Sequence, residues 1–312
     1  MEGGTLYTSF QSNGGDVFYD RVGDFSGSSN ISASHRDQIA ELFYEQKLMN
    51  DRLRLKAGKI DVNGEFGVAD NAGEFVNSTF AWSASFVGMP TYPDASYGGM
   101  VEFAPNDTYF VRAGVFDGAG AQGYRTGMRG VRTLFGDPSD LYYVLEAGAN
   151  CSLCRDLPGT IKVGLFRHTG DFTRFDGSTA NGVNGAYFIV DQCLFKEEPA
   201  NDEDIQALSM FVRGAVTDRN VADVPWSIAA GVQWIGAVPG RDDDVCGCGV
   251  SYNGFTNASD AVRHGDEVVL ELFYKAQLTH YFYVKPDVQY ILSPSGVFDD
   301  AALVAVRAGI EF

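Results

Sequence analysis

The sequence predicts an all-β protein, an antiparallel transmembrane β-barrel, on three observations. Apolar residues alternate with polar or charged ones through the last part of the chain, residues 267–312. No stretch approaches the ~18 consecutive apolar residues that a membrane helix requires. Short polar turns alternate with longer loops that are rich in Gly and Asp. Together these features are typical of a barrel that crosses an outer membrane.

The closing segments show the alternation most clearly. They are Glu267–Thr279, Tyr281–Tyr290 and Ala302–Phe312. A strand places successive side chains on opposite faces, so each segment has one apolar face and one face that carries charge. The chain ends in an aromatic residue, Phe312, after an alternating apolar strand. This ending resembles the C-terminal signal of bacterial outer-membrane barrels, which implies recognition by the barrel-assembly machinery.

Earlier in the chain, the predicted strands form hairpins that are separated by longer loops. Two of the hairpins turn at an Asn-Asp pair, a combination that favours turns. The predicted strands before the closing three are Thr5–Ser12, Gln38–Leu48, Arg52–Lys59, Met100–Ala104, Thr108–Phe116, Leu141–Ala149, Thr160–Arg167, Ala186–Lys196, Ile205–Thr217, Pro225–Ile235 and Val245–Phe255. Long loops are predicted at Gly14–His35, Ile60–Gly99, Gly118–Ser139 and Gly170–Gly185. This pattern gives about 14 strands in one domain that spans residues 1–312.

The start of the chain, Met1–Gly4, has neither the basic residues nor the apolar core of a secretory signal. A barrel of this kind must be exported, so we expect a mature or truncated start. Such barrels have even strand numbers, and about 16 strands would require one more hairpin. We therefore expect the chain to lack both the signal peptide and the first hairpin.

The charge excludes one class of partner. The formal net charge is −18, whereas binding of nucleic acid needs a basic surface. We expect most of the acidic residues in outer loops, for example in Asp242–Asp244 and Glu197–Asp204. Each cluster is explained equally well as a solvated loop that keeps the protein soluble.

The five cysteines do not indicate a cofactor or metal site. Cys151 and Cys154 have the spacing of half a zinc site, but no second such pair or nearby histidine completes it. They stand between two predicted strands, so we expect a turn disulfide or free thiols. Cys246 and Cys248 share a face with apolar residues, and we interpret them as small side chains that face lipid.

Several segments resemble the carbohydrate-selective porin family of bacterial outer membranes, the OprB type. The resemblance covers the chain from about residue 38, and the order and spacing of the segments carry it. They are Leu42–Gln46, Leu53–Lys59, Asn77–Phe80, Pro90–Pro93, Tyr97–Gly99, Gly164–Gly170, Gly185–Tyr187 and the closing strands. The resemblance implies a monomeric 16-stranded barrel, embedded in outer-membrane lipid, through which glucose and other small sugars diffuse passively into the periplasm.

The polar faces of the predicted strands supply candidates for a pore. A sugar needs polar groups for its hydroxyls and aromatic faces for its C–H surface, at sites that hold it only modestly. With the long loop described next, the candidate pore-lining residues are Arg54, Lys56, Asp61, Glu65, Asn77, Trp82, Tyr92, Glu102, Arg112, Lys162, Arg213, Glu271, Lys285 and Asp287. Any one charge is as well explained by a salt bridge between strands. For the whole set a water-filled lumen is the better explanation, because a dry core full of charges is too costly.

The long loop, residues 60–99, is the best candidate for a constriction. It lacks strand periodicity over about forty residues, and loops of such length are usually functional or disordered. Its aromatic residues, such as Trp82 and Tyr92, argue against disorder. The alternative is a loop that packs on the barrel mouth and contributes shape without contacts.

Three other functions remain open at this point. An enzyme in the same architecture is disfavoured, because His168 has no accompanying Gly-x-Ser-x-Gly motif and the alternation needs no catalytic explanation; paired carboxylates for glycoside hydrolysis are not excluded. A general or anion-selective porin would suit the basic residues on the polar face. A structural anchor to the cell wall would need an N-terminal binding domain, which this sequence does not contain.

Overall fold

The computed structural model describes residues 3–15, 22–126, 136–154, 156–199, 201, 204–258 and 263–312. Within these residues a single antiparallel sheet of 14 strands follows the chain order from β1 to β14. The strands are β1 Gly4–Asn13, β2 Arg36–Leu48, β3 Leu53–Ile60, β4 Ser96–Phe103, β5 Tyr109–Asp117, β6 Leu141–Cys154, β7 Leu157–Thr173, β8 Thr179–Lys196, β9 Ala207–Thr217, β10 Trp226–Ile235, β11 Val245–Gly254, β12 Glu267–Gln277, β13 Phe282–Leu292 and β14 Ala301–Ile310. The predicted all-β class and the number of strands are therefore confirmed.

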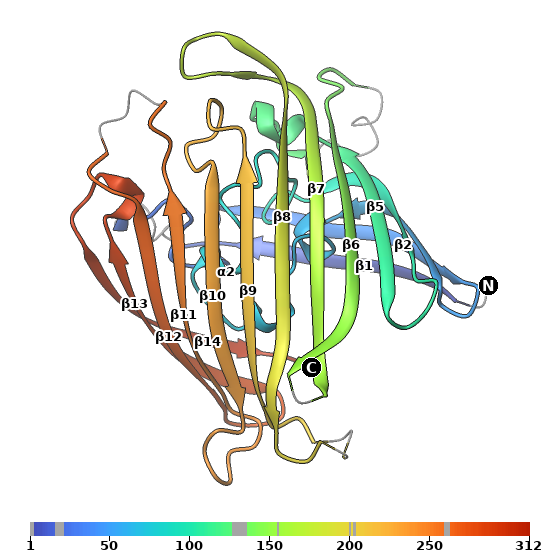
Figure 1. Ribbon diagram of the computed structural model, residues 1–312, viewed down its shortest axis with the longest axis vertical. Helices are drawn as coiled ribbons and strands as arrows, with labels where there is room; N and C mark the ends of the chain where they lie inside the picture. Colours follow the sequence, from blue (N-terminus) through green and yellow to red (C-terminus); the bar gives the residue numbers. More distant parts are fainter. Residues whose placement is uncertain are drawn as a thin grey trace.

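The sheet curls into a curved wall around an interior that is filled by chain (Figure 1). Strands β6–β10 stand at the front of this view, and β1 and β2 cross behind them. In the described residues β1 pairs with β2 alone and β14 with β13 alone, so these two strands form the edges of the sheet. No helix among the described residues is long and apolar enough to cross a membrane.

The hairpin of β7 and β8 is longer than predicted. Asp171 pairs with Asn181 and Thr173 with Thr179, so most of the predicted loop Gly170–Gly185 is strand. The prediction was wrong because backbone pairing outside the lipid needs no apolar alternation, and these residues show none. The predicted start of β4 is also late by four residues, since Ser96 already pairs with Ile60.

The cysteines are free thiols. The sequence predicted Cys151 and Cys154 between two strands, but both lie in the last part of β6. The difference arises because β6 extends beyond its alternating part. Cys246 and Cys248 lie on the outer face of β11, and Cys248 is exposed, as predicted. Parts of the predicted loops Gly14–His35 and Gly118–Ser139, of the acidic cluster Glu197–Asp204 and of Met1–Gly4 fall outside the described residues.

The two faces of the sheet differ as the alternation predicts. In β12 the side chains of Leu270 and Leu272 are 43 % and 59 % exposed, whereas Glu271 is 3 % exposed. Aromatic side chains lie on the outer face near the strand ends: Trp226 stacks on Tyr252 with ring centroids 5.0 Å apart. The apolar face therefore points outward to lipid, and the charged face points inward.

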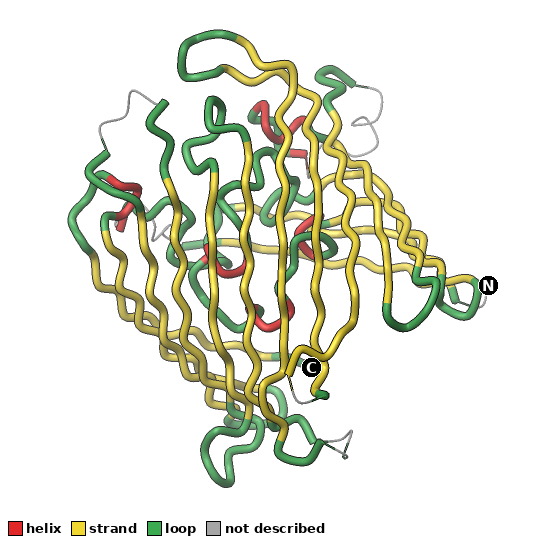
Figure 2. The backbone as a smooth tube through the Cα atoms, in the orientation of Figure 1, coloured by secondary structure: helices red, strands yellow, loops and turns green. Residues whose placement is uncertain are grey.

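The interior is occupied by residues 61–95, which connect β3 to β4 and which we call the inner segment (Figure 2). It contains three short helical turns, η1 Val62–Gly64, η2 Asp70–Ala72 and α2 Ser78–Ala81. Two further turns, η3 Ala119–Gln122 and η5 Pro294–Gly296, lie in other connections.

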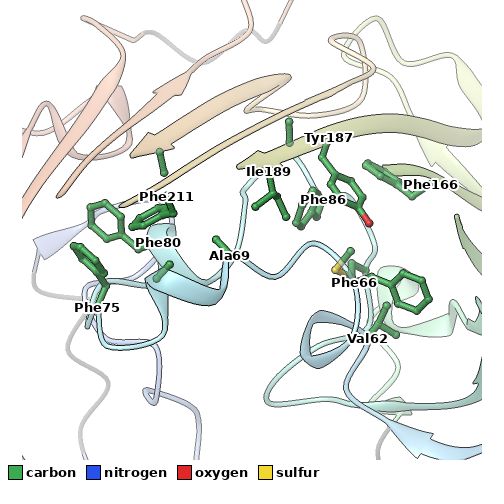
Figure 3. Close-up of a cluster of buried hydrophobic side chains, with 14 of the residues drawn as sticks. Val62, Phe66, Ala69, Phe75, Phe80, Phe86, Phe166, Tyr187, Ile189 and Phe211 are labelled. Atoms are coloured by element: carbon green, nitrogen blue, oxygen red, sulfur yellow. The ribbon is translucent and has the colours of Figure 1, made fainter. Parts of the chain in front are cut away.

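Aromatic residues of the inner segment form a core with the inner face of the strands (Figure 3). The ring centroid of Phe75 lies 5.4 Å from that of Phe211 in β9. Phe86 packs edge-on to Tyr187 of β8 at 5.2 Å. Burial of these rings, each worth roughly 1.5–3 kcal/mol, explains how a segment with little regular structure adopts one position.

Candidate substrate pathway

Charged residues of opposite sign alternate across four neighbouring strands of the inner face. Arg54 of β3, Glu102 of β4, Arg112 of β5 and Glu146 of β6 are direct partners in the strand register. Arg54 Nη2 lies 3.2 Å from Glu102 Oε2, and Arg112 Nη2 lies 2.7 Å from Glu146 Oε1. Arg112 Nη1 is 3.6 Å from Glu102 Oε2. We call these four residues the charge ladder.

Glu65 attaches the inner segment to the charge ladder. Its carboxylate accepts a hydrogen bond from Arg54 Nη2 at 2.7 Å and another from Lys56. Burial alone would raise the pKa of Glu65, but the hydrogen bonds and positive charges of Arg54 and Lys56 outweigh it and lower this pKa. Glu146 contributes a second contact, because it accepts a hydrogen bond from the backbone N–H of Gly67 at 3.0 Å.

A second anchor lies on β7 and β8. Lys162 Nζ donates to the carbonyl oxygen of Val68 at 2.8 Å and lies 2.7 Å from Asp70 Oδ2. Asp191 accepts hydrogen bonds from the backbone N–H groups of Asp70 and Asn71 at 3.1 and 3.0 Å. These two backbone groups open the turn η2, so Asp191 satisfies donors that the turn itself leaves free.

A third anchor holds residues 76–79. The carboxylate of Glu271 accepts hydrogen bonds from the N–H groups of Val76 and Asn77 at 2.6 and 2.8 Å. The Asn77 side chain caps α2 by accepting from Thr79 N, and its Nδ2 donates to Gln289 Oε1 at 3.0 Å. Gln289 in turn donates to Asp287, which is buried beside this contact.

Glu74 provides a fourth anchor with two lysines. Lys275 Nζ lies 2.9 Å from Glu74 Oε1, and Lys285 Nζ donates to the backbone carbonyl of Glu74 at 2.8 Å as well as to its carboxylate. Burial raises the pKa of Glu74, but the hydrogen bond and charge of Lys285, followed by those of Lys275, lower it overall. Glu74 is therefore held as a carboxylate between two cations.

Four of the predicted pore-lining residues lie outside these four anchors. Arg213 is buried and donates from Nη2 to the carbonyl oxygen of Thr79 at 2.6 Å. Trp82 packs against the aromatic core. Asp61 accepts hydrogen bonds from the N–H groups of Asn63 and Tyr92, and burial raises its pKa. The Tyr92 hydroxyl donates to the carbonyl oxygen of Ile31 at 2.5 Å.

The structure thus brings most of the predicted charged residues into contact with the inner segment, and most are buried. Glu102 instead contacts Arg54 and Arg112, and Asp287 contacts Gln289. A pore-lining role for each stays a prediction. Sequence reasoning missed Asp191 and Asp70. Asp191 lies two positions after Ile189 in β8, so both side chains are on the inner face of the strand. An acidic residue on the inner face is the signal that would have identified it.

His168 shows how the interior uses a residue that could have been catalytic. Its ring is buried, Nδ1 accepts a hydrogen bond from the Gly170 N–H at 3.0 Å, and Nε2 lies 2.7 Å from the Gly118 carbonyl oxygen. These two bonds fix a neutral tautomer with the proton on Nε2. Both ring nitrogens are therefore engaged in structural contacts. No group of three or more His, Cys, Asp or Glu side chains among the described residues has the geometry to hold a metal ion.

Comparisons with known proteins agree with this architecture. The sequence model of one protein family, described as carbohydrate-selective porin, OprB family, matches residues 1–312 of this chain. The chain superposes on the high-pH structure of Pseudomonas putida OprB with a TM-score of 0.80 at 19 % identity, covering 98 % of this chain and 82 % of that one. The low-pH structure of the same protein gives a TM-score of 0.55 at 19 % identity, with coverage of 88 % and 66 %.

A more distant similarity involves a loop L8 deletion mutant of OmpT, an outer membrane protein of Vibrio cholerae. Its TM-score is 0.50 at 16 % identity, with 89 % of this chain and 82 % of that chain covered. A search among curated protein sequences gave no match. At these identities, the structural similarities establish the fold alone.

Proposed function

Because this chain belongs to the carbohydrate-selective porin family, OprB, we propose that it lets glucose and other small sugars diffuse passively into the periplasm. Membership in the family makes it an integral outer-membrane porin for carbohydrates. Glucose as a substrate, the pore-lining residues and the monomeric state are our proposals. The proposed transport needs no energy source and no catalytic group.

The observation that supports this proposal is the position of the inner segment across the interior of the barrel. Charged residues on β3, β6, β7, β8, β12 and β13 hold it, through Glu65, Gly67, Asp70, Glu74 and Asn77. A segment held at so many places narrows the lumen to a fixed passage. Residues 60–99 then form the constriction, and the predicted pore-lining residues either face this passage or hold the segment that shapes it.

The balance of charge favours neutral solutes over anions. Arg54 lies within 4.0 Å of three carboxylates, those of Glu45, Glu65 and Glu102. Arg112 and Lys162 are likewise paired with acidic residues. Paired charges orient polar solutes without creating the single-sign potential that an anion-selective pore requires. This pairing favours a sugar pathway over the alternative of a general anion porin.

Assembly into the membrane is the other part of the proposal. The last strand, β14, presents Val304, Val306 and Ile310 outward, and the exposed Phe312 follows it. We expect the barrel-assembly machinery to bind this strand, and outer-membrane lipid to cover its apolar face once it is inserted.

Swelling of proteoliposomes tests the substrate class. Purified protein is reconstituted into vesicles, and swelling is followed in isotonic glucose, maltose or sodium succinate. We expect swelling in glucose to be faster than in succinate, and vesicles without protein to show none. Equal rates for all small solutes would instead assign a general porin.

A further inference from the structure

A cavity opens at the end of the barrel where the strands are joined by short turns. Its volume is about 460 Å³, and its rim includes Asn50–Arg52 of the β2–β3 turn and Asn106–Asp107 of the β4–β5 turn. The inner faces of β5 and β7 form its wall, and Asp70 of the inner segment closes one side. Short turns face the periplasm in barrels of this kind, so the cavity is the last enclosed space before a solute leaves.

One wall of this cavity is an aromatic ring, that of Phe110 on β5. Phe110 lies opposite Gly148 in the strand register. A Cβ atom added to Gly148 would lie only 2.1 Å from Phe110 Cζ, so the ring rests directly on the backbone of β6. Only glycine at position 148 lets the ring lie there. Phe110 is thus fixed against the inner wall at the edge of the cavity and is not part of the buried aromatic core.

Polar groups of both signs surround this ring. The guanidinium carbon of Arg112 lies 5.0 Å from its centroid, and the guanidinium is fixed by the Glu146 and Glu102 carboxylates. The Glu102 and Asp70 side chains remain 25 % and 62 % exposed, so their oxygens are accessible as acceptors. The cavity therefore offers the aromatic surface of Phe110 together with fixed donors and acceptors.

We propose that this cavity is a second sugar subsite, at the periplasmic end, in which the part of the Phe110 ring that lines the cavity contacts the C–H surface of a pyranose ring while Arg112, Glu102 and Asp70 bind its hydroxyls. The inference rests on the proposed sugar transport and assigns a place to one step of it, the release of the sugar. The volume lies within the about 300–1,000 Å³ of small-molecule sites, which combine apolar or aromatic walls with a few placed polar groups.

The chemistry of the rim selects the occupant. Asp51, Asp107 and Arg52 line the rim, where Arg52 lies 3.9 Å from Asp107, while Asp70 is paired with Lys162 and Arg112 with Glu146. Because these charges are paired, they offer hydrogen-bond partners without the single-sign potential that would attract an anion. A neutral sugar that enters the cavity replaces its hydrogen bonds to water with hydrogen bonds to these groups, and it does the reverse when it leaves. The net gain in binding is therefore modest, and the sugar is released.

The test compares three variants in single-channel recordings with glucose. Phe110→Leu removes the aromatic surface but keeps an apolar side chain, Phe110→Tyr keeps the ring, and Phe103→Leu removes an exposed ring from the outer face of β4. We expect Phe110→Leu to raise the half-blocking glucose concentration by about threefold to tenfold, the range of an aromatic contact. Phe110→Tyr and Phe103→Leu should leave it unchanged.

The possible outcomes separate the subsite from the proposed function. If glucose blocks the wild type and Phe110→Leu equally, the subsite is wrong while sugar transport stands. If neither glucose nor maltose blocks the wild type, the channel holds no sugar site and the subsite falls, while the swelling of proteoliposomes decides separately whether sugars pass. Should Phe110→Leu yield no channels, Gly148→Ala displaces the ring without removing any polar side chain. If the subsite exists, Gly148→Ala should raise the half-blocking glucose concentration as Phe110→Leu was expected to do. An unchanged concentration in Gly148→Ala would overturn the subsite.

Discussion

Glu271 of β12 holds the backbone of Asn77 through a hydrogen bond of 2.8 Å from the Asn77 N–H to its carboxylate. The same carboxylate accepts the N–H of Val76 at 2.6 Å. The side chain is buried, so no water replaces these donors, and the contact fixes the start of α2 to the barrel wall. A single inward side chain thus holds two backbone groups of the inner segment against the wall.

Glu271→Ala should therefore loosen the inner segment. The variant leaves the buried N–H groups of Val76 and Asn77 without this acceptor, and each buried donor left unsatisfied costs about 1–3 kcal/mol. We expect larger and noisier single-channel currents than in the wild type, because the backbone of Val76 and Asn77 is released from the wall. Glu197→Ala, which removes an exposed acidic side chain from the β8–β9 turn, is the matched control and should change nothing. Wild-type currents in Glu271→Ala would show that this anchor does not shape the passage.

The charge ladder gives a prediction for stability. Arg112→Met leaves the buried carboxylate of Glu146 without its guanidinium partner. Loss of one partner of a buried pair costs about 3–5 kcal/mol, so the free energy of unfolding in detergent should fall by about this amount. The double variant Arg112→Met/Glu146→Gln should recover part of the loss, since the uncompensated charge is gone. A loss below about 0.5 kcal/mol in the single variant, the usual size of a surface effect, would argue against the pairing.

The sequence predicted the wall of the barrel better than its interior. Residues such as Leu270 and Leu272 alternate because one face must meet lipid, and this constraint is local and periodic. The contact of Glu271 with Asn77 joins residues 194 positions apart, and no pattern along the chain encodes it. The inward direction of Glu271 could be predicted, whereas its partner could not. The β7–β8 hairpin was underestimated for a related reason, because beyond the lipid its pairing leaves no apolar signal.

Asp24 makes part of the stability depend on pH. Burial, together with the negative charge of Glu267, raises the pKa of Asp24 from 3.8 to about 6. The folded state therefore binds this proton more tightly than the unfolded state does, and the free energy of unfolding falls as the pH rises from about 4 to about 6. Above that range the full cost of ionising the buried carboxyl remains, up to about 3 kcal/mol.

Asp24→Asn should remove this part of the pH dependence. The measurement is the difference in unfolding free energy between pH 4.5 and pH 7.5, in detergent, for the wild type and the variant. We expect a smaller decrease with pH in Asp24→Asn. Identical pH profiles would mean that Asp24 ionises normally in the folded protein.

The outward position of Cys248 can be tested by thiol labelling. This thiol is exposed on the outer face of β11, whereas Cys193 of β8 is buried. In lipid vesicles an apolar maleimide should label Cys248, and a charged, membrane-impermeant maleimide should not. The test uses a background in which Cys151, Cys154, Cys193 and Cys246 are replaced by Ser, and Cys248→Ser in that background should abolish the apolar labelling. Rapid labelling of Cys248 by the charged reagent would place it in water and contradict the assignment of the two faces.

The most direct test of sugar transport is the single-channel conductance of the reconstituted protein in a planar bilayer, titrated with glucose, maltose and succinate. We predict a current that glucose and maltose reduce in a saturable manner, with no comparable effect of succinate at equal concentration. Open channels that no sugar blocks would contradict a sugar site in the passage formed by the inner segment.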